Sequence, residues 1–270
     1  SLTIPSIAYE KVCILFNIGA IQSQLAASQG NEGLNNDAAL KLAAKYFQGA
    51  SGIFQALKHL ASSAVGSHEL SSDMQSEILN VLHNIMLAQG QEAFFYKAAN
   101  DNMKEAVIAK IACQCEDYYA EALRQMQVVK FNWPDKDWVN IIGMKQAAFH
   151  GIAEYFQSVV SGQKKDFGEQ IGRLQKAVEC LKGAESRGGL YFTNVLRDYL
   201  TKSSNNLEEA KKDNDFIYHA RIPDYKQLTP IGKAQLAKPT NIPLKFRPSS
   251  VDLFEKFLPV GVQQAVKTLE

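Results

Sequence analysis

The stretch QEAFFYKAANDNMKEAVIAKIA, residues 91–112, contains the end of one helical pattern, a short polar break and the beginning of the next. Three aromatic residues, Phe94, Phe95 and Tyr96, are consecutive in its first half. Successive residues of an α-helix are rotated by about 100°, so three adjacent rings cannot all face one core. The stretch therefore predicts two helices joined by a turn, with at least one ring directed away from the main core.

Working outward from this stretch, the chain reads as a succession of long helices up to about residue 219. The expected helices cover 6–29, about 36–65, 72–100, 103–129, a segment that follows the turn at 133–138 and ends at 162, 166–186 and 190–218. The sequence SDMQ at 72–75 resembles a capping box at the start of the third. Helices of this length joined by short turns pack as antiparallel neighbours. No strict 34-residue repeat is present, so we predict an all-α helical solenoid core without exact repetition.

The character of the sequence changes after Arg221. Prolines recur at positions 223, 230, 239, 243, 248 and 259, a density that excludes a continuous helix. Interspersed apolar residues make the segment too hydrophobic for a free linker, so we predict an extended arm laid back along the helices. A short helix is expected at 251–259. The predicted domain boundaries are 1–258 for the helical domain and 259–270 for the start of a following domain.

The overall composition is that of an ordinary globular protein, with 270 residues, 46% hydrophobic residues and a net charge of +1. This balance provides no global field that would attract nucleic acid. No apolar run approaches about 18 residues, so no membrane-spanning segment is predicted. The four cysteines are sparse and unpatterned, which is typical of a reducing cytosol.

The sequence provides no catalytic or metal-binding motif. His150 and Glu154 are four residues apart on one expected helix, but they lack the further ligands of a zinc site. Gly188 and Gly189 precede LYFTN without the lysine of a phosphate-binding loop. We therefore predict no enzyme activity, no cofactor, no metal and no small-molecule substrate.

Helical geometry assigns the three rings to different sides of their helix. The expected core stripe contains Ile78, Leu82, Ile85, Met86, Ala93 and Tyr96. Phe94 lies about 160° from Ile78, opposite this stripe. On the next helix Val107 and Ile111 are four residues apart and form a ridge. Either both helices are central and buried on two sides, or the second side is an exposed apolar patch that receives a partner's amphipathic helix.

A family resemblance favours the second interpretation. The chain resembles the BRO-one (BRO1) domain family in the segments at 6–27, 40–54, 85–112 and 211–224, and LFEKFLPVGVQQA at 253–265 resembles the junction into a V-shaped domain. The resemblance implies a tetratricopeptide-like helical core. It also implies that the chain lacks an N-terminal part of the domain that includes some β-structure.

The resemblance further implies a partner and a set of contact residues. The partner is the C-terminal amphipathic helix of an ESCRT-III subunit, the charged multivesicular body protein of the fourth class. The residues carried over are Phe94, Lys97, Val107 and Ile111, with Asp37 and Lys41 at the polar rim. A cytoplasmic adaptor is therefore expected, recruited to endosomes and to sites of membrane scission, and acting in multivesicular-body sorting, cytokinesis, virus budding and links to apoptosis.

Two alternatives and one regulatory residue complete the expectations. A generic tetratricopeptide-like scaffold would bind an extended peptide, and a curvature-sensing module would bind an endosomal membrane surface through clustered lysines. Tyr218 matches a tyrosine that the family can present for phosphorylation, which would disturb docking of the arm. The alternative for Tyr218 is a core tyrosine that bonds through its hydroxyl.

Overall fold

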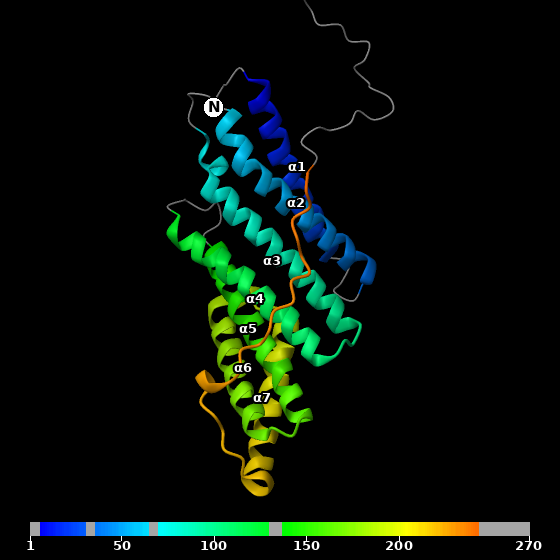
Figure 1. Cartoon of the computed structure of the whole chain (residues 1–270), viewed down its shortest axis with the longest axis vertical. Helices are drawn as coiled ribbons and strands as arrows, with labels where there is room; N and C mark the ends of the chain where they lie inside the picture. The colour runs from blue at the N-terminus through cyan, green and yellow to red at the C-terminus, as the bar shows by residue number, and fades with distance from the viewer. Residues whose placement is uncertain (1–5, 31–35, 65–69, 130–136, 243–270) are drawn as a thin grey trace, which may run out of the picture.

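The described residues of the computed structural model are 6–30, 36–64, 70–129 and 137–242, and they contain helices but no strand. The α-helices are α1 (Ile7–Gln29), α2 (Asp37–Ala64), α3 (Ser76–Asn100), α4 (Glu105–Val128), α5 (Trp138–Gln163), α6 (Phe167–Gly188) and α7 (Asn194–Asp213). Each helix contacts the next one along the chain, which gives an elongated antiparallel stack (Figure 1). The expectation of an all-α antiparallel helical core is confirmed.

Side-chain caps define the starts of α1 and α2, whereas the predicted start of α3 needs a correction. The Ser6 hydroxyl accepts a hydrogen bond from the amide of Tyr9, and the Asn36 side chain accepts from the amides at the start of α2. The capping box expected at 72–75 is wrong, because Ser72–Met74 forms a short 3₁₀ turn, η2, instead. Gln75 is extended, with ψ of 144°, so the chain can enter α3 only at Ser76.

The seventh helix is shorter at both ends than the sequence suggested. A 3₁₀ turn, η3 (Gly189–Tyr191), precedes it, and the α-helix ends at Asp213. The next five residues form a wider π turn, η4 (Asn214–Tyr218), and His219 follows with a left-handed φ of 48°. The Asn214 side chain both donates to and accepts from the backbone of Ala220. These bonds stop the helix and direct the chain into the arm.

The centre of the core is an aromatic cluster around Phe95. This ring is fully buried and meets the Phe149 ring edge-to-face, with centroids 5.2 Å apart. Phe156 and Tyr199 complete the cluster. The stripe expected from Ile78 is mostly buried, but the opposite side of α3 is also buried at Leu87 and Ala98. Helix α3 is therefore central, and periodicity alone could not separate its two covered sides.

The arm crosses the helices in the reverse of their order along the chain. Residues 220–242 run in extended form, with one short 3₁₀ turn, η5 (Tyr225–Gln227), over α6, α5, α4, α3 and α2 (Figure 1). Close backbone approaches require glycine at two points, because a Cβ on Gly168 would lie 2.2 Å from the Arg221 carbonyl oxygen and one on Gly52 only 1.9 Å from that of Thr240. The expected helix at 251–259, the domain boundary at 258 and the last three prolines lie outside the described residues.

Helix α1 carries an apolar stripe on its outer surface that the sequence reading did not single out. The stripe consists of Ile7, Ile14, Ile18, Ile21 and Leu25, which are 37–88% exposed. Their spacing of three, four or seven residues places them on one face of the helix. Within the described residues, no other element covers this face.

Candidate functional site

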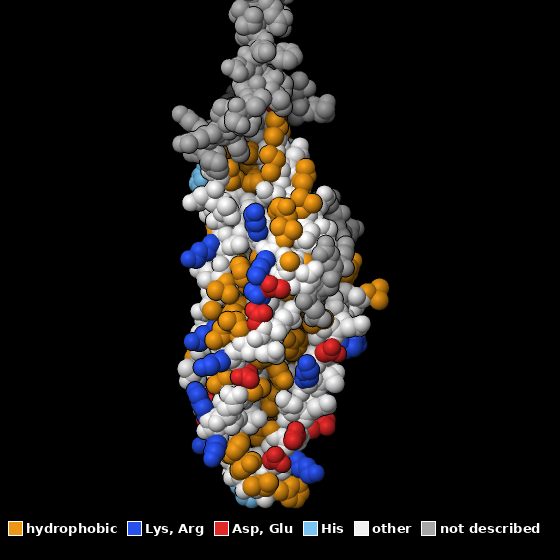
Figure 2. Space-filling model, turned by 90° about the vertical axis from the view of Figure 1, so that its right-hand side faces the viewer, with side chains coloured by type: hydrophobic (Ala, Val, Ile, Leu, Met, Phe, Trp, Pro, Cys, Tyr) orange, Lys and Arg blue, Asp and Glu red, His pale blue; other side chains and the backbone are white. Residues whose placement is uncertain are grey.

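Three helix ends meet at one side of the molecule and bring most of the predicted site residues together. The first two turns of α2 supply Asp37 and Lys41, and the last turn of α3 supplies Lys97. The Asp37 carboxylate accepts from Lys41 at 2.7 Å and from Lys97 at 2.5 Å. Lys97 also pairs with Asp101 at 2.8 Å. Figure 2 views this side of the molecule and shows acidic and basic side chains interspersed among hydrophobic ones.

Of these ion pairs, the one between Asp37 and Lys97 joins α2 to α3. The two lysines, Lys41 first and Lys97 second, lower the pKa of Asp37 below its ordinary value through hydrogen bonds to its carboxylate. Hydrogen bonds to Asp101 and Asp37 raise the pKa of Lys97. The sequence could not predict the mutual pairing, because it depends on how α2 and α3 align. All three side chains remain accessible, with exposed fractions of 28–62%.

The apolar part of the site comes from α3 and α4, on either side of a tight turn. Asn102 has a left-handed φ of 49°, and the amide of Met103 returns to the Ala98 carbonyl at 3.1 Å, a geometry that ends α3. Phe94 is partly buried and packs against the edge of the core. Val107 is 38% exposed. We call Phe94, Val107 and the rim of Asp37, Lys41 and Lys97 the α3–α4 patch.

Ile111 does not have the exposure expected of a partner contact, because only 1% of its surface is accessible. On α4 it is rotated by about 40° from Cys115 and about 60° from Ile108, both of which are buried. It therefore joins their stripe against the core. The arm also crosses α4 at this level, since the amide of Ala234 donates to the carbonyl of Lys110 at 3.1 Å. The expectation of an exposed ridge at Val107 and Ile111 is correct only for Val107.

Sequence reasoning missed Gln91, a residue of α3 that binds the arm. The side chain of Gln91, fully buried and three residues before Phe94 on α3, accepts from the amides of Leu236 at 3.0 Å and Ala237 at 2.9 Å. It also donates to the carbonyl of Ala234 at 2.8 Å. Leu236 is held at this point with 44% of its surface exposed. An exposed leucine within a proline-rich segment provides no helical period that would have identified it.

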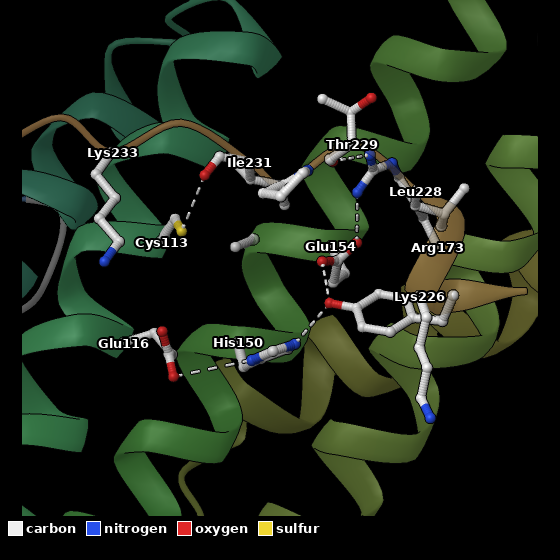
Figure 3. A pocket seen from close by; sticks show the side chains of 13 residues that line it. Cys113, Glu116, His150, Glu154, Arg173, Lys226, Leu228, Thr229, Ile231 and Lys233 are labelled. Atoms are coloured by element: carbon white, nitrogen blue, oxygen red, sulfur yellow. Dashed lines mark hydrogen bonds and ion pairs between the residues drawn. The ribbon is translucent and has the colours of Figure 1, made fainter.

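A second polar cluster lies between the arm and helices α5 and α6 (Figure 3). Arg173, only 2% exposed, donates to Glu154 at 2.9 Å, to Glu169 at 2.6 Å and to the arm carbonyl of Thr229 at 2.7 Å. The Tyr225 hydroxyl donates to Glu154 at 2.8 Å. We call Glu154, Glu169, Arg173, Tyr225 and the Thr229 carbonyl the arm clasp.

The arm clasp borders a cavity of about 360 Å³ but lacks the features of an active site. His150 contacts the Tyr225 hydroxyl at 3.1 Å, so the expected His150–Glu154 pair is bridged by a tyrosine. Burial and the hydrogen bond to Glu154 raise the pKa of Tyr225, and burial raises that of the Cys113 thiol to about 11. Both groups therefore remain protonated, and the carboxylates are already paired. The described residues contain no group of three or more potential metal ligands.

Tyr218 is not the buried core tyrosine that was the alternative to a regulatory residue. It is 44% exposed at the end of η4, and its ring stacks on Phe167 with centroids 3.6 Å apart. A polar cavity of about 330 Å³ beside the two rings is lined by residues of α5, α6 and α7. Tyr218 is accessible at the point where the arm begins, and its role as a regulatory site stays a prediction.

None of the helices in the described ranges is long and apolar enough to pass through a bilayer. Comparison with known proteins then relates the chain to a single family. A family model described as "BRO1-like domain" matches residues 1–270. Programmed cell death 6-interacting protein of Xenopus laevis is 46% identical over 267 residues. That match covers 98% of the chain but only 30% of the relative.

Two solved structures agree with these sequence matches. The complex of the ALIX BRO1 domain with CHMP4C superimposes with a TM-score of 0.87 at 46% identity, covering 95% of this chain and 70% of that one. ALIX in complex with a SIVmac239 late domain gives a TM-score of 0.88 at 44% identity, covering 99% of this chain and 37% of that one. The fold and the family expected from the sequence are therefore confirmed.

Proposed function

The chain belongs to the BRO1-like domain family, and from this premise we propose that it is a non-enzymatic adaptor for ESCRT-III. Its α3–α4 patch binds the C-terminal amphipathic helix of a CHMP4-type subunit. The known complex of the ALIX BRO1 domain with CHMP4C supports this choice of partner. The chain acts in the cytoplasm, at endosomes and at sites of scission, in multivesicular-body sorting, abscission and virus budding.

The observation that carries the proposal is the accessible apolar surface at Phe94 and Val107. Phe94 lies near the end of α3 and Val107 near the start of α4, the two helices joined by the α3–α4 turn. Around them, Asp37, Lys41 and Lys97 are accessible and charged. An apolar centre within a charged rim is the usual composition of a protein-binding surface.

The physics is that of an amphipathic helix packed on an apolar surface. Apolar side chains at positions i, i+3, i+4 and i+7 of the partner would pack on Phe94 and Val107. The partner's charged side chains would pair with the rim and set its register and orientation. A short helix that orders on binding loses conformational entropy, so we expect a dissociation constant on the order of micromolar. A polymerised partner would strengthen recruitment by avidity.

The structure gives less support to the alternatives. A receptor for extended peptides would need an open track across the helices, and the chain's own arm occupies that path. Catalysis would need an unpaired polar group at the cavity beside the arm clasp, whereas Glu154 and Arg173 there are bonded to each other and to the arm. A membrane-binding module would need clustered lysines without acidic partners, and the α3–α4 patch does not supply such a cluster, because Lys41 and Lys97 are paired with acids.

The test is calorimetric titration of the chain with a peptide of the CHMP4-type C-terminal helix. Val107→Asp and Phe94→Asp should each weaken binding by about a hundredfold or more, because an unpaired carboxylate in an apolar contact costs several kcal/mol. Val128→Asp is the matched control, since Val128 is on the same helix as Val107 but is 73% exposed at its other end. Unchanged binding by a folded Val107→Asp chain would exclude this surface.

A further inference from the structure

The arm contains a threonine that is followed directly by proline. Of the eight prolines in the sequence, only Pro230 comes after a serine or a threonine, and that residue is Thr229. Both residues are exposed, and they follow the η5 turn in the extended part of the arm. A hydroxyl residue followed by proline is the acceptor pattern of proline-directed kinases, which bind their substrates as extended segments. Thr229 therefore has the sequence and the accessibility that such an enzyme requires.

The backbone of Thr229 is also part of the arm clasp. Its carbonyl accepts from Arg173 at 2.7 Å, and the same guanidinium donates to Glu154 at 2.9 Å and to Glu169 at 2.6 Å. One cation thus serves two carboxylates, so +1 and −2 leave these three side chains with a net charge of −1. The Arg173 and Glu154 side chains are only 2% and 5% exposed, and charges interact more strongly in such a setting than in water.

A phosphate on Thr229 would stand next to this acidic cluster. Figure 3 shows the threonine side chain beside the Arg173 guanidinium and directed away from the cavity. Lys176, a cation on the same helix as Arg173, is already paired with Glu179 at 2.8 Å. Lys226 lies in the exposed part of the arm, where an ion pair is weak. Arg173 is therefore the cation for which the phosphate would compete.

This competition would break the arm clasp. A phosphate adds about two negative charges at neutral pH, and next to acidic side chains it disrupts local structure by like-charge repulsion. If Arg173 turned to the phosphate, Glu154 would be left buried without its cation, which is strongly destabilising. Either effect weakens the bond between Arg173 and the Thr229 carbonyl, which attaches this part of the arm to α6.

We propose that Thr229 is a phosphorylation site for a proline-directed kinase, and that its modification releases residues 225–231 from the arm clasp. The γ-phosphoryl group of ATP is transferred to the Thr229 Oγ1 atom. The bond between the γ-phosphorus and the β–γ bridging oxygen breaks, a base of the kinase takes the hydroxyl proton, and ADP leaves. The inference goes beyond the adaptor function, because it concerns the attachment of the arm and does not depend on the α3–α4 patch.

The first test is phosphorylation of the folded full chain by a mitogen-activated protein kinase with ATP, read by mass spectrometry of the intact chain and of its peptides. The expected product carries a single phosphate, on Thr229, and Thr229→Ala should abolish its formation. Thr240→Ala is the matched control and should be modified as the parent is, because Thr240 is an exposed threonine of the same arm that precedes asparagine. A folded chain that gains no phosphate, or gains it only elsewhere, would overturn the site.

Hydrogen exchange of the phosphorylated chain then measures the release of the arm. The amides of Gln227 and Leu228 form the hydrogen bonds of η5, and a single turn is not stable without its packing. Their exchange should become about tenfold faster after phosphorylation. The amides of Leu236 and Ala237, which are bonded to α3, are internal controls and should keep their protection. Unchanged or slower exchange at Gln227 and Leu228 would contradict the release.

Glu169→Gln separates competition for Arg173 from a general effect of the modification. Without this carboxylate, the phosphate can take its place on Arg173 while Glu154 remains paired. Phosphorylation of the Glu169→Gln chain should therefore change exchange at the η5 amides by less than about twofold. Glu185→Gln is the control on the same helix, because Glu185 pairs with Arg197, and it should keep the full acceleration. An equal acceleration in both variants would overturn the competition for Arg173.

Discussion

The arm clasp and the α3–α4 patch both contain carboxylates paired with cations, but the two regions differ in burial. In the arm clasp, Arg173 and Glu154 are 2% and 4% exposed, and their hydrogen bonds go to each other and to neighbouring groups. In the α3–α4 patch, the Asp37 and Lys41 side chains are 51% and 62% exposed. Buried charges must be paired within the fold, whereas exposed ones can exchange partners with water or another protein.

This difference separates a structural from a binding role. A cavity next to buried charges resembles an active site, yet the donors and acceptors of the arm clasp are already bonded to each other or to the arm. The α3–α4 patch has weaker pairs and no deep cavity, but its polar and apolar groups are accessible. For this chain, accessibility is therefore a better guide to the partner site than the density of charged residues.

The largest effect should follow from breaking the arm clasp. Arg173→Leu leaves the Glu154 carboxylate buried without its cation, so the free energy of unfolding should fall by about 3–5 kcal/mol. Urea unfolding followed by circular dichroism measures this. Adding Glu154→Leu should recover part of the loss, because it removes the unpaired charge. A loss below about 1 kcal/mol would show that the pair is not buried in solution.

A smaller effect should follow from removing one hydroxyl from the arm clasp. Tyr225→Phe deprives Glu154 of a donor, and the free energy of unfolding should fall by about 1–3 kcal/mol. Tyr218→Phe makes the same change at a half-exposed ring that stacks on Phe167. It should have almost no effect on unfolding. Equal losses in the two variants would contradict the contrast between buried and accessible polar groups.

The smallest effect concerns the exposed pairs of the α3–α4 patch. Nuclear magnetic resonance titration should place the pKa of Asp37 below 3.8, and both Lys41→Met and Lys97→Met should raise it. Because the folded-state pKa is lowered, the stabilising contribution of Asp37 is present above the unfolded-state pKa and is lost as the pH falls through the folded-state value. High salt should weaken the effect. An Asp37 pKa at or above 3.8 in the parent chain would contradict the pairing.

Much of the fold could be predicted from local patterns in the sequence. Short runs of residues mark the ends of several helices. Examples are the break between Gln29 and Asn36 and the turn at Asn102 between α3 and α4. The length of the helices then requires antiparallel neighbours. The end of α7 was misplaced because the π turn at 214–218 continues its helical pattern, and the stop depends on a side-chain bond from Asn214 to Ala220.

The candidate site was less predictable because it combines distant segments. Periodicity directed Phe94 away from one core stripe but could not show that the other side of α3 is also covered. Ile111 was misjudged because its burial depends on packing against α3 and on the arm, which lies more than 120 residues later in the sequence. The side chain of Gln91 joins α3, α4 and the arm, and no local pattern distinguishes it from an ordinary helical glutamine.

The central claim is that a partner helix binds at the α3–α4 patch and leaves the arm clasp unaltered. Hydrogen exchange of the full chain, with and without a saturating CHMP4-type helix peptide, measures both regions in one experiment. The account predicts added protection around residues 91–112 and no change at residues 150–173. Protection confined to residues 150–173, or none around residues 91–112 at saturation, would contradict it.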